Sequence, residues 1–219
     1  MEHLAYLFAN NRGWADRQTA GDPDFFRDLC AIQRPDLLWV GCSDSRVPAN
    51  EIVGLAPGEL FVHRNVANLV IHTDLNCLSV LQYAVDVLKV EHVIVCGHYG
   101  CGGVQAALTA APLGLIDNWL RHVQDVAERH RERLAGSPDK ALDRLCELNV
   151  VEQAANVCRT SILLDAWRRG QPVAVHGWVY ALRDGLLRDL GFCVRSADDL
   201  PRVHEQAVRA LPSAPGAAG

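Results

Sequence analysis

The chain has 219 residues, a formal net charge of -5 at pH 7 and a hydrophobic fraction of 49%. This length and apolar content suit a single compact α/β domain over residues 1–219, with or without arms. The acidic balance argues against a nucleic-acid partner, which usually leaves a basic footprint, and no apolar run is long enough for a membrane span.

The beginning of the chain predicts a helical arm rather than a secretion signal. It lacks the basic start, long apolar core and cleavage site of a signal peptide, so we expect a cytoplasmic protein. "HLAYLFANN" has apolar residues at helical spacing, and "DPDFFRDLCAIQ" offers Asp22 as an N-cap and Pro23 at the first helical position. With a break at Gly21, residues 1–34 are expected to pack either on a partner subunit or on their own domain.

Strands and helices are expected to alternate along the rest of the chain. Short apolar runs predict buried strands over 36–41, 59–65, 91–98 and 171–182. Helical patterns lie over 72–90, capped by Thr73 or Asp74, over 115–134, and over 151–170, closed by Gly170. The tail 210–219 is expected to fray. This order predicts an α/β fold with a mainly parallel sheet flanked by helices.

The eight cysteines are many for a cytoplasmic chain. In a reducing compartment they are not expected to form a disulfide framework. Most are expected to be small buried hydrophobic residues, namely Cys30, Cys77, Cys146, Cys158 and Cys193. Cys42 and Cys101 differ from these because polar and flexible residues surround them.

Potential metal ligands follow two of the predicted strands. Open parallel sheets bind ligands outside the carboxyl ends of their strands. Cys42 lies just past one strand, and His98 and Cys101 lie at and past the end of another, so they could converge on one edge. Two sulfurs and one nitrogen suit tetrahedral zinc, and three protein ligands leave an open position that is typical of catalytic zinc.

Other interpretations of this site stay open. Cys96 could close the site and make the zinc structural, although the alternation in "VIVCGH" favours its burial in the sheet. A redox pair of Cys96 with Cys101 would lack the usual Cys-x-x-Cys spacing. Asp44 could ligate the metal or accept a hydrogen bond from a bound water, with Arg46 holding it, or the two could be an ordinary ion pair. Zinc with two thiolates is formally neutral, so hydroxide formation would favour alkaline pH.

Three motifs together resemble the β-class carbonic anhydrases, especially the bacterial ones. They are "CSDSR" at 42–46, "HRNVAN" at 63–68 and "HYGCGG" at 98–103, within a resemblance that runs from about residue 4 to 190. The resemblance implies reversible hydration of CO2 to bicarbonate and a proton by zinc-bound hydroxide. It implies one zinc per chain on Cys42, His98 and Cys101, the catalytic dyad Asp44 and Arg46, and a homodimer or a dimer of dimers.

Two further sets of residues carry roles that the resemblance implies. The CO2 pocket would be lined by Gln33, Phe61, Val66, Tyr83 and Gly102, although composition alone would place Phe61 and Tyr83 in the core. The bicarbonate-regulated (type II) subgroup is indicated by an inhibitory anion site at Trp39, Gly41, Arg64 and Tyr180. In that subgroup, bicarbonate or low pH favours a state in which Asp44 releases Arg46 and caps the zinc.

Two alternatives to a regulated carbonic anhydrase are weighed. A hydrolase of carbon disulfide or carbonyl sulfide would use the same scaffold, because these substrates are also linear and apolar. A zinc-stapled module that only senses bicarbonate belongs to a different class. The open coordination position and the Asp44–Arg46 dyad argue against a purely sensing role.

Overall fold

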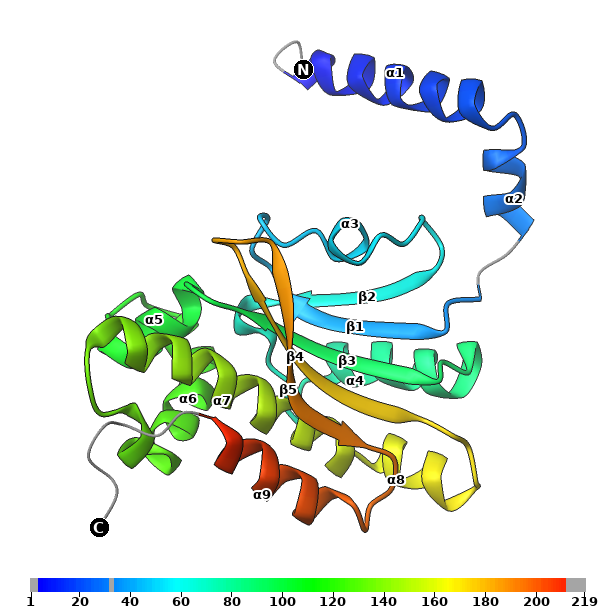
Figure 1. The fold of residues 1–219 in the computed structure, drawn as a ribbon. Coiled ribbons are helices and arrows are strands. Elements are labelled where there is room, and N and C mark those ends of the chain that lie inside the picture. The colour runs from blue at the N-terminus through cyan, green and yellow to red at the C-terminus, as the bar shows by residue number, and fades with distance from the viewer. Residues whose placement is uncertain (1–3, 32–33, 212–219) are drawn as a thin grey trace.

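The computed structural model describes residues 4–31 and 34–211, which are built around a five-stranded sheet (Figure 1). The strands are β1 (Leu37–Cys42), β2 (Leu60–Asn65), β3 (His92–His98), β4 (Ala174–Ala181) and β5 (Leu186–Val194). Their order is β2-β1-β3-β4-β5, with the first four parallel and β5 antiparallel to β4. The prediction of an α/β fold with a mainly parallel sheet is confirmed.

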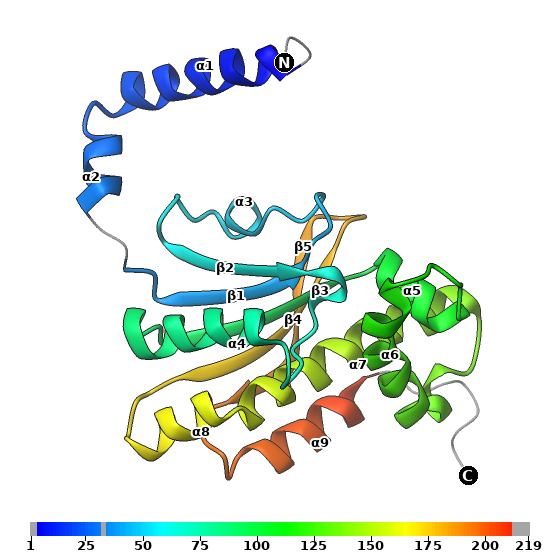
Figure 2. The ribbon, with the colours of Figure 1, turned by 180° about the vertical axis from the view of Figure 1, so that it is seen from behind.

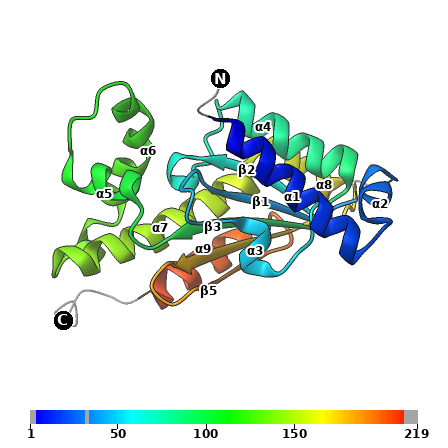
Figure 3. The same ribbon diagram turned by 90° about the horizontal axis from the view of Figure 1, so that it is seen from above.

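Helices cover both faces of this sheet. The α-helices of the described residues are α1 (Ala5–Gly21), α2 (Phe25–Ala31), α3 (Ala49–Val53), α4 (Leu75–Gln82), α5 (Gly102–Thr109), α6 (Ile116–Arg129), α7 (Pro138–Arg159), α8 (Ser161–Arg168) and α9 (Leu200–Ala210). α3 lies on one face, and α4, α7, α8 and α9 lie on the other (Figures 1 and 2). Figure 3 shows α5 and α6 beside the end of the sheet at which β3 leads into α5. Within the described ranges, no helix has the length and apolarity needed to cross a membrane.

The main apolar core lies between the sheet and α7. β1 is buried along almost its whole length, as expected for a central parallel strand that is covered on both faces. α7 is buried on several sides, because β3, β4, α5, α6 and α9 all pack against it. A smaller cluster around Trp39 and Ile94 lies on the α3 face. The sheet is therefore held rigidly on both sides of the strand ends that matter below.

The strands agree with the sequence-based prediction, and the N-terminal helices agree in part, because α2 begins at Phe25 whereas Pro23 was expected at its first position. The four predicted strands all form, with ends within about three residues of those expected. The arm forms two helices that break after Gly21, and Asp74 caps α4 by accepting a 3.0 Å hydrogen bond from the Asn76 N–H. Beyond Gln82 the predicted helix continues as a π-helical turn over Tyr83–Leu88.

The prediction of one helix over 151–170 is wrong. α7 begins at Pro138, and it ends at Arg159 because Thr160 takes an extended conformation. The Thr160 hydroxyl then accepts a hydrogen bond from the Leu163 N–H and caps α8. The helix expected over 115–134 also ends early, with a 3-10 turn over its last residues. Helices α3, α5 and α9 and strand β5 were not predicted at all.

The cysteines are mostly buried, with two exceptions. Cys77, Cys146 and Cys158 are buried as predicted. Cys30 is exposed and Cys193 only partly buried, so both of these predictions are wrong. Cys30 lies in α2, whose described side chains make no buried layer, whereas β5 is an edge strand that leaves Cys193 partly open.

The arm formed by α1 and α2 projects away from the domain (Figures 1 and 3). No residue of α1 is buried, yet it carries Leu7 and Phe8 with 48% and 68% of their surfaces exposed. Trp14 packs edge-on against Phe25 and Phe26, so the two helices are joined by aromatic contacts. Exposed apolar side chains of this kind are unfavourably hydrated unless another surface in an assembly covers them.

Glu152 of α7 is a buried carboxylate, with 2% of its surface exposed. His130 and His204 each donate from Nε2 to its Oε1 at 2.9 Å, and Arg129 bonds its other oxygen. Burial raises the pKa of Glu152, but these hydrogen bonds and the Arg129 charge outweigh it and lower that pKa below 4.5. The carboxylate thus joins α7 to α9 and to the end of α6.

Replacement of Glu152 by Gln is expected to lower the free energy of unfolding near neutral pH by about 2–4 kcal/mol, because the buried amide cannot satisfy all the donors that the carboxylate accepts and Arg129 loses its counter-charge. Because the pKa of Glu152 is lower in the folded than in the unfolded protein, its ionised carboxylate stabilises the fold at pH values above the unfolded-state pKa of 4.5. This stabilisation is lost as the pH falls toward and through the folded-state pKa. The difference between wild type and Glu152→Gln should therefore shrink below pH 4.5. Urea denaturation across this pH range measures it.

Asp165→Asn is the matched control, because it breaks only an exposed pair with Arg168. It should change the free energy of unfolding by less than about 0.5 kcal/mol at every pH. A Glu152→Gln effect that is equally small, or that does not depend on pH, would contradict the role given to this carboxylate.

Candidate metal centre

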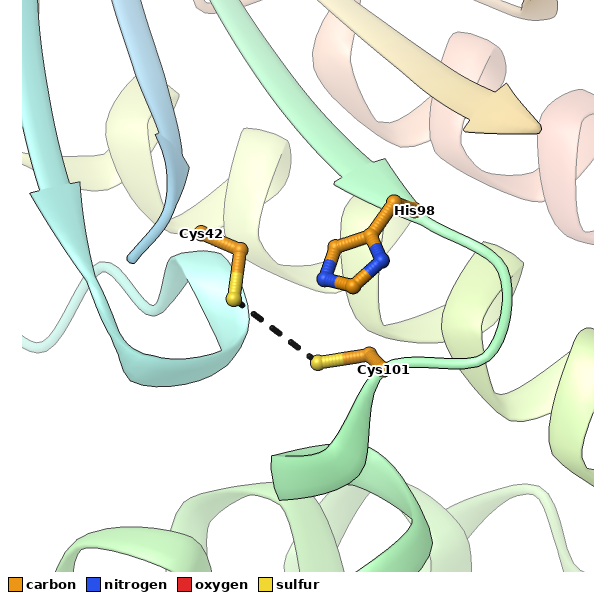
Figure 4. A group of neighbouring side chains, drawn as sticks. All are labelled: Cys42, His98 and Cys101. Atoms are coloured by element: carbon orange, nitrogen blue, oxygen red, sulfur yellow. Dashed lines mark hydrogen bonds between the residues drawn. The ribbon is translucent and has the colours of Figure 1, made fainter. Parts of the chain in front are cut away.

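Two parallel strands bring the three predicted ligands together (Figure 4). Cys42 is the last residue of β1, and His98 is the last residue of β3, which pairs directly with β1. Cys101 follows three residues later, at the N-cap position of α5. All three are buried, with 5%, 1% and 2% of their surfaces exposed.

The geometry of these side chains fits a tetrahedral metal ion. The two sulfur atoms lie 3.8 Å apart, and the ligand atoms of the three residues all lie within 4.8 Å of one another. Two thiolates on one zinc, each at about 2.3 Å, stand roughly 3.8 Å apart in tetrahedral geometry. His98 Nδ1 bonds the Tyr99 carbonyl, while its buried Nε2 has no hydrogen-bond partner and faces the sulfurs. A buried nitrogen of this kind needs a partner, and a cation would supply it.

The contact between the two thiols shifts their pKa values in opposite directions. The hydrogen bond with Cys101 lowers the pKa of Cys42 against the opposing effect of burial. The same hydrogen bond with Cys42, together with burial, raises the pKa of Cys101. A divalent cation removes this conflict, because it favours the thiolate form of both residues. The cluster is therefore better suited to a metal than to two free thiols.

Asp44 and Arg46 form a bidentate ion pair at the rim of this centre. Arg46 donates from Nε to Oδ1 at 3.0 Å and from Nη2 to Oδ2 at 2.6 Å. The side-chain hydrogen bond from Arg46 is the main cause that holds the pKa of Asp44 well below its usual range. Asp44 Oδ2 also lies 3.7 Å from His98 Nε2, so the carboxylate borders the metal ligands while it remains paired with Arg46.

The residues predicted for an anion site share one face of the sheet. Gly41 stands opposite Arg64 in the β1–β2 register, two residues after Trp39. Trp39 is buried in the same apolar cluster as Tyr180, and a side chain at Gly41 would meet Trp39 Nε1 at 2.5 Å. Arg64 bonds the carbonyl oxygens of Cys42, at 2.8 Å, and of Asp44. Arg64 therefore holds the turn that carries Cys42 and the Asp44–Arg46 pair.

The predicted pocket residues fall into two groups. Phe61 and Tyr83 lie together, with ring centroids 5.9 Å apart, but Tyr83 is 45% exposed, so its placement in the core by composition is wrong. Val66 packs so closely to α5 that a side chain at Gly103 would meet it at 2.8 Å. Gly102 begins α5 directly after the last ligand. Gln33 lies outside the described residues.

Sequence reasoning missed the residues that support the segment after β2. Ala67 in this segment has a left-handed φ of 66°. Asn149 donates to the Ala67 carbonyl at 2.9 Å, Gln153 accepts from the Val70 N–H at 2.9 Å, and Asn156 donates to the Val70 carbonyl at 3.1 Å. Their spacing of four and three residues along α7 places them on one helical stripe, and a stripe of amides in an apolar helix was the available signal.

A second cluster of potential metal ligands is formed by His63, Asp74 and Cys77. Its groups are already partnered: the Asp74 carboxylate caps α4, and His63 Nε2 lies 3.2 Å from the Asn65 amide nitrogen. Burial also raises the pKa of the Cys77 thiol to about 12. The cluster around Cys42 is therefore the better metal site.

Comparisons with known proteins support this reading. A family model described as carbonic anhydrase matches residues 37–187. A carbonic anhydrase of the fungus Emericella nidulans is 50% identical over 84% of this chain and 82% of its own. The structure of a Coccomyxa β-carbonic anhydrase in complex with acetazolamide has a TM-score of 0.86 and 40% identity, over 95% and 99% of the two chains. One of two tetrameric β-carbonic anhydrases from Sordaria macrospora has a TM-score of 0.83 and 36% identity, over 89% and 100%.

Proposed function

The chain belongs to the β-carbonic anhydrase family and is an enzyme of that class, and we propose that it hydrates CO2 with a zinc ion held by Cys42, His98 and Cys101. The observation that carries the zinc proposal is the buried, unpartnered His98 Nε2 beside two sulfurs at tetrahedral spacing. The expected likeness to bacterial members in particular stays a prediction, since two of the three matches above are fungal.

Asp44 is proposed to orient the nucleophile. Zinc, when bound, lowers the pKa of water and so supplies hydroxide for attack on CO2. The Asp44 carboxylate stays ionised and can only accept hydrogen bonds, because Arg46 holds its pKa low. It would accept the hydrogen of the nucleophile and aim the lone pair at carbon. Arg46 keeps Asp44 at the rim, where it does not occupy the open coordination position.

The substrate pocket is proposed to lie beside Phe61, Val66 and Tyr83, with Gln33 as a further lining residue. An apolar wall suits CO2, which is linear and has no net charge or dipole. The N–H of Gly102, in the first turn of α5, has no partner within its own helix and can face a developing negative charge. The exposure of Tyr83 supports a pocket that a second copy of the chain completes.

We also propose that the protein assembles as a homodimer or as a dimer of dimers. The Sordaria macrospora structures are described as tetrameric, and this chain is similar to one of them. The exposed apolar side chains of α1 support an arm, residues 1–34, that packs on a partner subunit. The residues 1–219 would then act as a single domain with this arm.

A cytoplasmic location is proposed because all eight cysteines are free.

Inhibition by bicarbonate at Trp39, Gly41, Arg64 and Tyr180 is the regulatory part of the proposal. Arg64 bonds the carbonyl oxygens of Cys42 and Asp44, so an anion that attracts Arg64 would loosen the turn that carries Asp44. The released carboxylate would need only a small movement, because it lies 3.7 Å from His98 Nε2. Bicarbonate would thus favour the state in which Asp44 caps the metal.

Zinc content tests the metal site directly. The wild type is expected to bind about one zinc per chain, and Cys101→Ser to lose most of it, because an alcohol is a poor zinc ligand. Cys77→Ser is the matched control, since Cys77 is equally buried but belongs to the partnered cluster. Metal analysis after dialysis measures both variants. Loss of zinc from Cys77→Ser, with zinc retained by Cys101→Ser, would place the zinc site at the cluster of His63, Asp74 and Cys77 instead.

Asp44→Asn tests the catalytic dyad. The amide cannot act as an anionic acceptor, so CO2 hydration is expected to fall by about 10²-fold or more while zinc stays bound. Stopped-flow hydration at alkaline pH, combined with metal analysis, separates these effects. Asp199→Asn on the distant α9 cap serves as the control and should keep its activity. Near-normal turnover of Asp44→Asn would refute the role of the dyad.

Trp39→Phe and Arg64→Ala test the anion site. Each removes a hydrogen-bond donor, and the bicarbonate concentration for half-inhibition should rise by roughly tenfold or more, the value of one charge-assisted bond. Inhibition is measured relative to the uninhibited rate of each variant, because Arg64 also supports the Asp44 turn. If both variants are inhibited like the wild type, the anion binds elsewhere.

A further inference from the structure

The turn between the last two ligands contains a side chain that leaves the metal site and contacts two other elements. Tyr99 and Gly100 join His98 to Cys101, and Gly100 takes a left-handed φ of 68° that glycine tolerates best. Such a turn is short, so any shift of its main chain moves both ligands. Glycine restricts its own main chain little, so contacts with neighbouring elements must fix the position of the turn.

Tyr99 supplies contacts that fix the turn. Its hydroxyl donates a hydrogen bond to the Glu147 carboxylate of α7. Its ring faces the guanidinium groups of Arg183 and Arg188, at 5.2 and 5.9 Å from the ring centre. Its main-chain N–H donates to the Tyr180 carbonyl at 3.0 Å. Tyr99 is thereby held between α7 and the β4–β5 hairpin.

The Tyr99 carbonyl in turn contacts the metal ligand. It lies 3.2 Å from His98 Nδ1, so this nitrogen donates and Nε2 is left with its lone pair toward Cys42 and Cys101. Second partners of this kind set the tautomer and the ring orientation of a metal-binding histidine. Here the second partner is a main-chain carbonyl within the turn itself. The position of this carbonyl, and so the orientation of the His98 ring, therefore depends on the hydrogen bond from Tyr99 to Glu147.

We propose that Tyr99 and Glu147 are a positioning pair, whose hydrogen bond holds the turn and thereby aims His98 Nε2 at the metal. The inference rests on the proposed zinc site and adds two residues that do not touch the metal themselves. A loss of the bond allows the carbonyl, and with it the imidazole, to rotate. The consequence is a faster release of the ion from the site, with little change in the fold.

The experiment compares zinc release and cobalt spectra in full-length protein. Tyr99→Phe keeps the ring and its contacts with the arginines but removes the hydroxyl, and Glu147→Ala removes the acceptor. Each is expected to release zinc to a chromogenic chelator about 10–100-fold faster than wild type, and to shift the visible bands of the Co²⁺-substituted protein. The double variant should be no worse than the poorer single variant, because both changes break one bond.

Thr160→Val is the matched control, since it removes another hydroxyl hydrogen bond associated with α7, far from the turn. It should lower thermal stability without altering zinc release or the cobalt spectrum. The proposal is overturned if Tyr99→Phe releases zinc at the wild-type rate with an unchanged spectrum, or if Thr160→Val accelerates release equally. A wild type that binds no zinc would instead refute the proposed zinc site, so the two failures are distinguishable.

Discussion

The parallel pairing of β1 with β3 is the constraint on which the metal centre depends. Parallel neighbours end at the same edge of a sheet, so Cys42 and His98 meet although 55 residues separate them in the chain (98 − 42 − 1). The sheet is covered on both faces, so its strands cannot slip without exposing their apolar side chains. The 3.8 Å spacing of the sulfurs therefore follows from a register that the whole core maintains.

The cluster of Cys42, His98 and Cys101 could be predicted because its signal is local. Cysteine and histidine are conspicuous where an apolar strand ends, and a parallel sheet brings strand ends together whatever the detailed packing. The Asp44–Arg46 pair could be predicted for a similar reason, since its members are only two residues apart in the chain. The strands were predictable for a related reason, since burial on both faces produces continuous apolar runs.

The parts that could not be predicted depend on partners far apart in the chain. The break at Thr160 carries no glycine or proline, and its capping role depends on a single hydroxyl whose direction no local pattern reveals. Glu152 would be an ordinary charged residue on a helix without His130 and His204, which come from elements 22 and 52 residues away. Strand β5 has one open edge and only partly alternating burial, so its pattern is ambiguous.

The supports of the centre act mainly on main-chain carbonyls. Arg64 bonds those of Cys42 and Asp44, Asn149 bonds that of Ala67, and that of Tyr99 faces His98. A carbonyl is present at every residue, so the sequence of a turn shows which groups it could offer but never which of them is used. Long side chains from neighbouring strands and helices determine the conformation of each turn. The Cys42, His98 and Cys101 motif therefore indicates the kind of site, while residues outside the motif determine its geometry.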